Sequence, residues 1–192
     1  KQQIELRDVV LSDKPQAMLV ASPKATVPIL VLPNGHVIDE SVDVMLWALK
    51  ESDPSNLLLS ENTANLTNML ILISEFDTKF KTALEAYKCA KRYRENNVAD
   101  CRAECEIFIA ALERRLMAHC FLMADEESLA DIALMPFIRQ FAKVERQWYL
   151  LSPYPKVRAW LNRYLQSAMF TKVMAKHPLW TTGKSTIVFG GE

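Results

Sequence analysis

The feature that most constrains the fold is a short apolar strand that begins at a proline. Residues 28–32 read PILVL, a PNG turn follows at residues 33–35, and residues 36–38 read HVI. This pattern predicts a β-hairpin, because two apolar runs flank a turn that contains proline and glycine. Proline has a fixed φ and no backbone N–H, so Pro28 belongs at the start or the edge of a strand. The residue before it, Val27, is held extended, which leaves its backbone groups free to pair with a ligand.

A helix is predicted directly after the hairpin, from Glu40 to near Ser52. It opens on Asp39, Glu40 and Ser41, and the unpaired backbone N–H groups of a helix start suit a carboxylate. A free strand edge and a helix N-terminus close together would hold a small peptide-like anion. On these residues alone the alternatives stay open, because many proline-led strands bind nothing and such a triplet is often a plain helix cap.

Two motifs carry a resemblance to a known family. Residues 22–32, SPKATVPILVL, and residues 37–41, VIDES, resemble the glutathione-binding half of the glutathione S-transferase family. The family pattern is a small residue before Pro-Lys, then Val-Pro-x-Leu, a turn, and Glu or Gln before a Ser that opens a helix. Residues 128–133, SLADIA, match the family further along, so the resemblance spans nearly the whole chain.

The resemblance implies a glutathione transferase architecture with two domains. An α/β thioredoxin-like N-terminal domain is expected at residues 1–52, and an all-α C-terminal domain at residues 62–192. Residues 53–62 begin with Asp-Pro-Ser-Asn and have the composition of a linker. Strand patterns disappear after this linker and helical periodicity takes over.

The thioredoxin-like domain is expected to be incomplete at its front. In the family this domain starts with a strand, a helix and a second strand, and the alternating residues 4–10 match the second strand. A parallel strand pair needs a crossover of a dozen or more residues, so about 20–30 residues are expected to precede Lys1. The family's catalytic Cys, Ser or Tyr lies in that segment, which leaves the catalytic residue unknown and the strand at 4–10 without a neighbour.

The resemblance also implies which residues bind the γ-glutamyl and cysteinyl parts of glutathione. Ser41 is expected to bind the γ-glutamyl carboxylate through its hydroxyl and backbone N–H. Glu40 is expected to bind the ammonium through a charge-assisted hydrogen bond. Val27 is expected to pair with the cysteinyl unit as an added strand would, with Pro28 in the cis form.

The glycyl carboxylate of glutathione needs a cation. Lys14 matches the lysine that serves this purpose in omega-like members, and Lys24 is a second candidate. The alternative for either lysine is an ordinary solvated surface charge.

Several helices are predicted after the linker. They cover residues 63–92, 98–119, 155–166 and 170–174, together with a helix that begins at Ser128 and contains Pro136. Ser128 and Asp131 have the spacing of a capping box, which favours a structural pair over a catalytic one. In helix 98–119, one stripe is apolar and the opposite face is interpreted as solvated surface; that face holds Glu104, Glu113, Arg114 and Arg115. The tail from Lys176 is expected to be irregular and to wrap back over the helical domain.

The charge balance excludes some classes of partner. The chain has 23 basic and 23 acidic residues, so its net charge is zero. Neither a nucleic acid nor a membrane is therefore expected as a partner. Metal binding is not expected either, since the cysteines form no metal or redox motif; they are Cys89, Cys101, Cys105 and Cys120. A reducing, cytoplasmic location fits these free thiols.

The leading hypothesis is a glutathione transferase or a glutathione-dependent thiol oxidoreductase. Its partners would be glutathione and an electrophilic or disulfide substrate, and family members are usually homodimers. Tyr87, Arg92 and Tyr93 could line the cleft for the second substrate, although residues at such helical spacing are as often core and surface. Two alternatives remain: a non-catalytic scaffold of the same fold that docks onto a protein, and a glutaredoxin-like redox enzyme.

Overall fold

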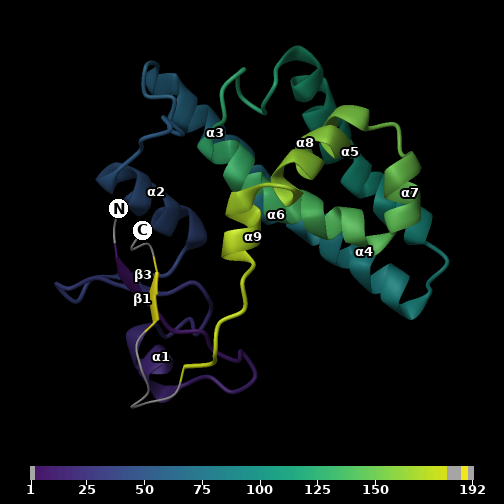
Figure 1. Cartoon of the computed structure of the whole chain (residues 1–192). Coiled ribbons are helices and arrows are strands. Elements are labelled where there is room, and N and C mark those ends of the chain that lie inside the picture. Colours follow the sequence, from purple (N-terminus) through teal and green to yellow (C-terminus); the bar gives the residue numbers. More distant parts are fainter. Residues whose placement is uncertain (1–2, 181–186, 190–192) are drawn as a thin grey trace. The chain divides into compact units, whose positions relative to one another are not determined.

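The computed structural model describes residues 3–180 and 187–189, which fall into two compact units (Figure 1). The first unit consists of Lys1–Pro54 together with Ala175–Glu192, and the second of Ser55–Met174. The sequence analysis assigned the tail to the helical domain, whereas the structure groups it with the first unit. The part of that prediction that concerns residues 181–186 and 190–192 lies outside the described residues.

The first unit contains short strands and two helices. Along the chain these are β1 (Ile4–Leu6), α1 (Gln16–Ala21), β2 (Leu30–Val31), β3 (Val37–Ile38), α2 (Ser41–Glu51) and β4 (Ile187–Phe189). The predicted hairpin is confirmed, because β2 and β3 pair antiparallel with Leu30 opposite Ile38. Gly35 closes the turn at a φ of +82°, a left-handed conformation that favours glycine.

The strand predicted at residues 4–10 is shorter than expected, and it has a neighbour. β1 pairs antiparallel with β4, so that Glu5 lies opposite Val188. A parallel bridge joins Asp8 to Leu179, and the backbone N–H of Trp180 donates to the carbonyl of Asp8 over 2.8 Å. The tail therefore joins the first unit by pairing with residues 4–8, which local periodicity cannot reveal because the paired residues lie far apart in the sequence.

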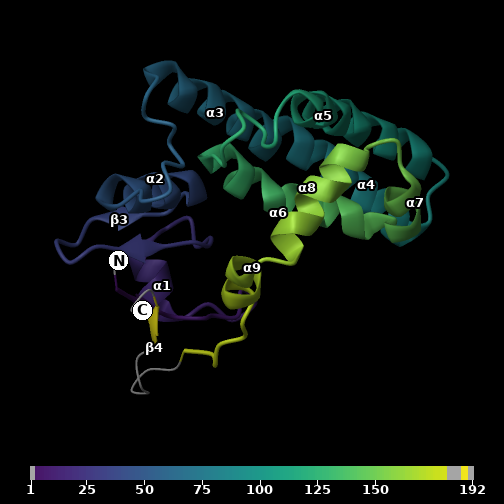
Figure 2. The same cartoon turned by 45° about the horizontal axis from the view of Figure 1, so that its top comes forward.

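The second unit is all helical. Its elements are α3 (Thr63–Glu75), η1 (Phe76–Phe80), α4 (Lys81–Tyr93), α5 (Val98–Ala118), α6 (Leu129–Val144), α7 (Arg146–Leu151), α8 (Pro155–Leu165) and α9 (Ala168–Val173). The predicted helices are confirmed to within a few residues at their ends, and α7 was not predicted. In both views α8 lies beside α5 and α6, which agrees with their contacts (Figure 2). No described helix is long and apolar enough to cross a membrane.

The predicted helix at residues 63–92 is continuous, but it contains a π-helical turn. Asn62 caps its start, since the Asn62 side chain accepts from the backbone N–H of Ala64. Within η1 the N–H of Lys81 reaches the carbonyl of Phe76, five residues back, where an α-helix would use the carbonyl four back. Both aromatic residues of this turn, Phe76 and Phe80, are almost fully buried.

An aromatic cluster forms the centre of the second unit. The rings of Phe76 and Phe80 lie 4.8 Å apart, and Phe108 meets both edge-on. The cluster continues through Phe137 and Phe141 of α6. All of the buried apolar side chains among the described residues belong to this unit, and the described part of the first unit contains none.

The predicted capping box at the start of α6 is confirmed. The carboxylate of Asp131 accepts from the backbone N–H of Ser128 over 3.1 Å and from its hydroxyl over 2.6 Å. The same carboxylate also accepts from the N–H of Leu122 and from the indole Nε1 of Trp160. Because Asp131 is fully buried, these four bonds satisfy a charge that would otherwise be costly to bury.

The assignment of Glu113 to the solvated face of α5 is wrong. Glu113 is only 8% exposed, and its two carboxylate oxygens accept from the backbone N–H groups of Lys156 and Val157 over 3.0 and 2.8 Å. These N–H groups belong to the first turn of α8, where a helix leaves its donors unpaired and favours a negative charge. Glu113 therefore joins α5 to the start of α8.

Candidate functional site

The start of helix α2 offers unpaired backbone donors. Glu40 is the residue before the first helical position, and its side chain makes no capping hydrogen bond. The backbone N–H groups of Ser41, Val42 and Asp43 have no hydrogen-bond partner within residues 3–180 and 187–189. Three free donors at the positive end of a helix of 11 residues form a place where a carboxylate can be bound.

Val27 presents a second set of unpaired backbone groups. The peptide bond between Val27 and Pro28 is cis, as the sequence analysis expected. Val27 is 53% exposed, and neither its N–H nor its carbonyl bonds to another residue in the described part of the chain. An extended peptide could therefore pair with Val27 as an added strand does.

An ion-pair cluster connects the approach to Val27 with the start of α2. The ammonium of Lys24 lies 2.7 Å from Oε1 of Glu40 and 3.0 Å from Oδ1 of Asp39. The hydroxyl of the buried Ser22 donates to the other oxygen of Asp39 over 2.7 Å. Because residues 22 and 24 bond to residues 39 and 40, the segment that leads into Val27 lies next to the first turn of α2.

The charges in this cluster hold one another in their ionised forms. The hydrogen bond from Ser22 and then that from Lys24 lower the pKa of Asp39 below its ordinary value. The hydrogen bonds to Glu40 and then to Asp39 raise the pKa of Lys24. The sequence analysis missed this arrangement, since it considered Lys24 either as a partner for a ligand carboxylate or as a solvated surface charge. The spacing of Pro-Lys and Asp-Glu across a hairpin was the available signal.

Lys14 lies apart from this cluster. It is exposed and has no ion-pair or hydrogen-bond partner among the described residues. It immediately precedes Pro15, the residue before helix α1. Its ammonium is therefore available to a ligand, but no contact positions it.

A small apolar cavity borders Val27. It has a volume of about 130 Å³ and its walls come from β2, α1 and the segment after β1. Val27, Ile29 and Val31 line one side, and Trp180 of the tail lines another. The guanidinium of Arg7 lies 4.9 Å from the centre of the Trp180 ring, which holds the indole in place. The first unit thus combines free backbone donors, charged side chains and an apolar wall.

Comparison with known proteins identifies the family. One family model, described as the glutathione S-transferase N-terminal domain, matches residues 1–56. A second, the glutathione S-transferase C-terminal domain, matches residues 95–163, so that together they cover more than half of the chain. The chain belongs to the glutathione S-transferase family. Its first unit is the thioredoxin-like domain of that family and its second is the helical domain, which confirms the expected fold.

Solved structures of glutathione transferases have the same fold. A glutathione S-transferase 1-6 from Anopheles dirus species B has a TM-score of 0.70 at 19% identity, over 86% of this chain and 79% of that one. Glutathione transferase F7 from Populus trichocarpa has a TM-score of 0.67 at 19% identity, over 83% and 79%. A family member from Pseudomonas fluorescens pf-5 with two glutathione bound has a TM-score of 0.68 at 16% identity, over 82% and 74%. A comparison with curated protein sequences found no match.

The structure separates the three residues considered for a second-substrate cleft of this glutathione S-transferase family member. Tyr87 is fully buried in the helical unit and packs against Phe141, so it belongs to the core and lines no open cleft there. Tyr93 is 68% exposed at the end of α4. Arg92 is exposed and lines a pocket formed by α4 and α6.

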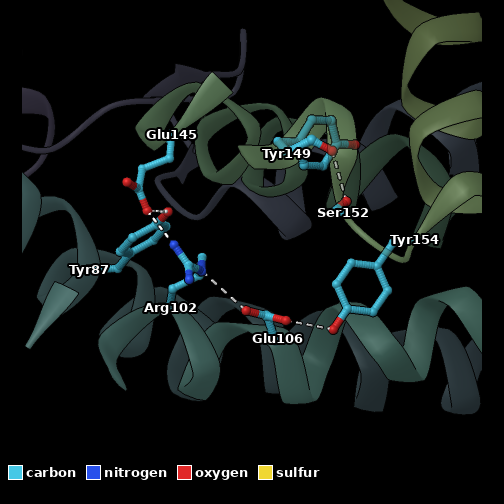
Figure 3. A network of polar contacts seen from close by, with 7 residues as sticks. All are labelled: Tyr87, Arg102, Glu106, Glu145, Tyr149, Ser152 and Tyr154. Atoms are coloured by element: carbon cyan, nitrogen blue, oxygen red, sulfur yellow. Dashed lines mark hydrogen bonds and ion pairs between the residues drawn. The ribbon is translucent and has the colours of Figure 1, made fainter. Parts of the chain in front are cut away.

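The hydroxyl of Tyr87 belongs to a polar network that includes α5 and the start of α7 (Figure 3). It donates to Glu145 over 2.8 Å, and Arg102 donates to the same carboxylate over 2.6 Å. Arg102 also bonds to Glu106, which accepts from the hydroxyl of Tyr154. This chain of bonds explains why the hydroxyl of Tyr87 is directed to Glu145 and not towards a ligand cleft.

The charge of Glu145 is stabilised by this network. Burial by itself would raise the pKa of Glu145, but hydrogen bonds from Lys91, Tyr87 and Arg102 outweigh that effect and the pKa lies below its ordinary value. Arg102 also stacks over the ring of Trp148, 4.4 Å from its centre. No group of three metal-ligating side chains occurs in the described part of the chain.

Proposed function

We propose that the chain binds glutathione on its thioredoxin-like unit and uses the glutathione thiolate for conjugation or for thiol–disulfide exchange. The observation that carries this proposal is the set of unpaired amides at residues 41–43, joined by the Lys24 cluster to the free backbone of Val27. A γ-glutamyl carboxylate needs such donors, and a cysteinyl backbone needs such an extended edge.

In this proposal each polar group of glutathione has a partner. Ser41 and the amides of the first turn of α2 bind the γ-glutamyl carboxylate, and Glu40 binds the γ-glutamyl ammonium. The backbone of Val27 pairs with the cysteinyl unit beside Pro28. Lys14 binds the glycyl carboxylate, as in omega-like members. None of these residues activates the thiol, so the catalytic residue is not assigned to any of them.

The wider setting of this function follows from the family. Solved relatives with glutathione or lactoylglutathione bound support glutathione as the ligand. We expect a homodimer in the cytoplasm, with an electrophile or a disulfide as the second substrate. Of the residues considered for that substrate, Arg92 and Tyr93 remain candidates because both are exposed.

Titration calorimetry with glutathione and with cysteinylglycine tests the proposal. Cysteinylglycine lacks the γ-glutamyl carboxylate and ammonium, so it is expected to bind at least tenfold more weakly than glutathione. Ser41→Ala removes the hydroxyl donor to a charged group and is expected to weaken glutathione binding about tenfold. Ser52→Ala at the other end of α2 is the matched control and should leave the affinity unchanged. Equal affinities for the two peptides would overturn the proposal.

A further inference from the structure

The C-terminal tail pairs with the start of the first unit at two places. Leu179 forms a parallel bridge with Asp8, and the N–H of Trp180 donates to the carbonyl of Asp8 over 2.8 Å. Further along the tail, β4 pairs antiparallel with β1, which has no other strand partner among the described residues. In both views the yellow tail lies beside α1 (Figures 1 and 2). The backbone pairing therefore determines where the indole of Trp180 lies within this unit.

Charged side chains hold this indole from the other side. The guanidinium of Arg7 lies 4.9 Å from the centre of the Trp180 ring, a cation–π contact. Nε of Arg7 also lies 2.9 Å from Oε1 of Glu5, which orients the guanidinium. Glu5 itself lies opposite Val188 in the β1–β4 pair. The indole is thus held both by the pairing of its own backbone and by a cation that extends from the paired strand.

The segment around Val27 has few other restraints. Residues 26–29 make no backbone hydrogen bond within the described ranges 3–180 and 187–189. The side chains of Val27 and Ile29 line the same apolar cavity of about 130 Å³ as Trp180. The described part of the first unit has no buried apolar side chain, so no packed core holds this segment. Packing around the cavity, with the indole as one wall, is therefore what restrains it.

The order of this segment determines how well the free backbone groups of Val27 can pair with a peptide. A ligand that must first order a segment loses part of its binding free energy, whereas a segment that is already held extended avoids that cost. We propose that Trp180 is a positioning residue of the glutathione site, which acts through Val27 and does not touch glutathione itself. This role rests on the proposed function, because the order of Val27 matters only where a peptide pairs with it.

Titration calorimetry of the full chain with glutathione tests the role of the indole. Trp180→Ala is expected to weaken glutathione binding about fivefold, because the ligand then has to order residues 26–29. Trp180→Phe keeps an aromatic ring in the wall of the cavity, so its affinity is expected to stay within about twofold of that of the unaltered chain. Leu179→Ala is the matched control and should leave the affinity unchanged, since the Leu179 side chain is 54% exposed and lies outside the lining of the cavity.

A modified ligand shows whether the indole acts through Val27. In the ester analogue of glutathione an oxygen replaces the cysteinyl N–H, so this ligand lacks the donor to the carbonyl of Val27. The unaltered chain is expected to bind the ester about tenfold more weakly than glutathione. Trp180→Ala is expected to weaken binding of the ester by about twofold at most, because the contact that the indole supports is already lost. A general loss of stability would instead weaken binding of both ligands by the same factor.

Arg7→Gln provides a test that does not depend on whether Trp180→Ala folds. It keeps the indole and removes only its cation, and it is expected to weaken glutathione binding about two- to threefold. Unaltered affinity in Arg7→Gln, unaltered affinity in a folded Trp180→Ala, or equal losses for glutathione and its ester would each overturn the role of Trp180. Equal binding of glutathione and cysteinylglycine by the unaltered chain would overturn the glutathione site itself, so the two failures can be distinguished.

Discussion

Lys24 forms an ion pair with Glu40, the carboxylate that is proposed to bind the ammonium of glutathione. Its ammonium lies 2.7 Å from Glu40, where the γ-glutamyl ammonium of glutathione is proposed to bind. The two cations would therefore compete for one acceptor, unless Lys24 remains with Asp39 alone. Because Lys24 and Glu40 are both largely exposed, solvent screens their ion pair and its contribution is small.

The first prediction concerns this competition. Lys24→Met removes the ammonium and keeps much of the length of the side chain, so it frees Glu40 for the ligand. Glutathione is expected to bind about two- to fivefold more tightly to this variant in titration calorimetry, which corresponds to one exposed ion pair. Lys50→Met, at the exposed C-terminal end of the same helix, should have no effect. Weaker binding by the Lys24 variant would mean that Lys24 itself contacts an anionic group of glutathione.

At the scale of the element, the start of α6 depends on one buried carboxylate. Asp131 accepts four hydrogen bonds, from Ser128, Leu122 and Trp160. It therefore holds together the cap of α6, the loop before it and a side chain of α8. Removing one acceptor leaves a buried donor without a partner, which costs more than the bond itself contributes.

Asp131→Asn places an amide NH2 against groups that are already donors. The free energy of unfolding is expected to fall by about 2–4 kcal/mol, because both the buried charge-assisted bonds and the cap are weakened. Urea denaturation followed by circular dichroism measures this change. Glu126→Gln removes an exposed charge from the same loop and should alter stability by less than about 0.5 kcal/mol. Similar effects of the two substitutions would contradict the role given to Asp131.

The elements of this chain could be predicted where their cause is local. The apolar period of α5, the Ser128–Asp131 spacing and the hairpin turn at Gly35 each appear within a few residues of sequence, and the structure confirms all three. Glu113 was misassigned because the group that buries it, the first turn of α8, lies more than 40 positions away. The periodicity of apolar residues along the sequence does not reveal non-local contacts of this kind.

In the candidate site, too, the features with a local cause could be predicted and the non-local contacts could not. The motif around Pro28 and Ser41 predicted which backbone groups are free, because a proline and a helix start determine this locally. It did not predict that Lys24 would pair with Glu40, since that contact requires the hairpin to bring residues 24 and 40 together. Tyr87 was considered for the second-substrate cleft because the sequence does not show that its hydroxyl bonds to Glu145, which lies far away in the chain.

At the scale of the whole molecule, a buried cysteine thiol and a partly buried tyrosine hydroxyl make the stability of the fold sensitive to alkaline pH. Burial raises the pKa of the Cys105 thiol to about 12, and nearby Cys101, Glu104 and Glu106 add to the effect. Burial, followed by a hydrogen bond to Glu106, also raises the pKa of Tyr154 to about 12. In the unfolded chain both groups ionise at their ordinary pKa values. Their contribution to stability is therefore complete below those values and is lost as the pH rises towards 12.

We expect the free energy of unfolding to fall by about 1–2 kcal/mol between pH 8 and pH 10 because of Cys105 alone, since the unfolded thiol loses its proton in this range. Urea denaturation at a series of pH values measures the slope. Cys105→Ala should be less stable at pH 8 but should show a smaller decline. Cys89→Ala, which alters an exposed thiol, should keep the slope of the unaltered chain. Equal slopes for all three proteins would show that Cys105 does not titrate as described.

The π-helical turn at Phe76–Phe80 limits how the helical unit can change in length. Its hydrogen bond reaches five residues back instead of four, so the turn takes up one extra residue locally and the later side chains of α4 keep their angular positions relative to α3. Deleting one residue from this turn is therefore expected to restore a regular α-helix with Leu84 and Tyr87 still in the core. Deleting one residue between Lys81 and Leu84, in the regular part of α4, would instead rotate every later side chain by about 100° and take Leu84 and Tyr87 out of the core.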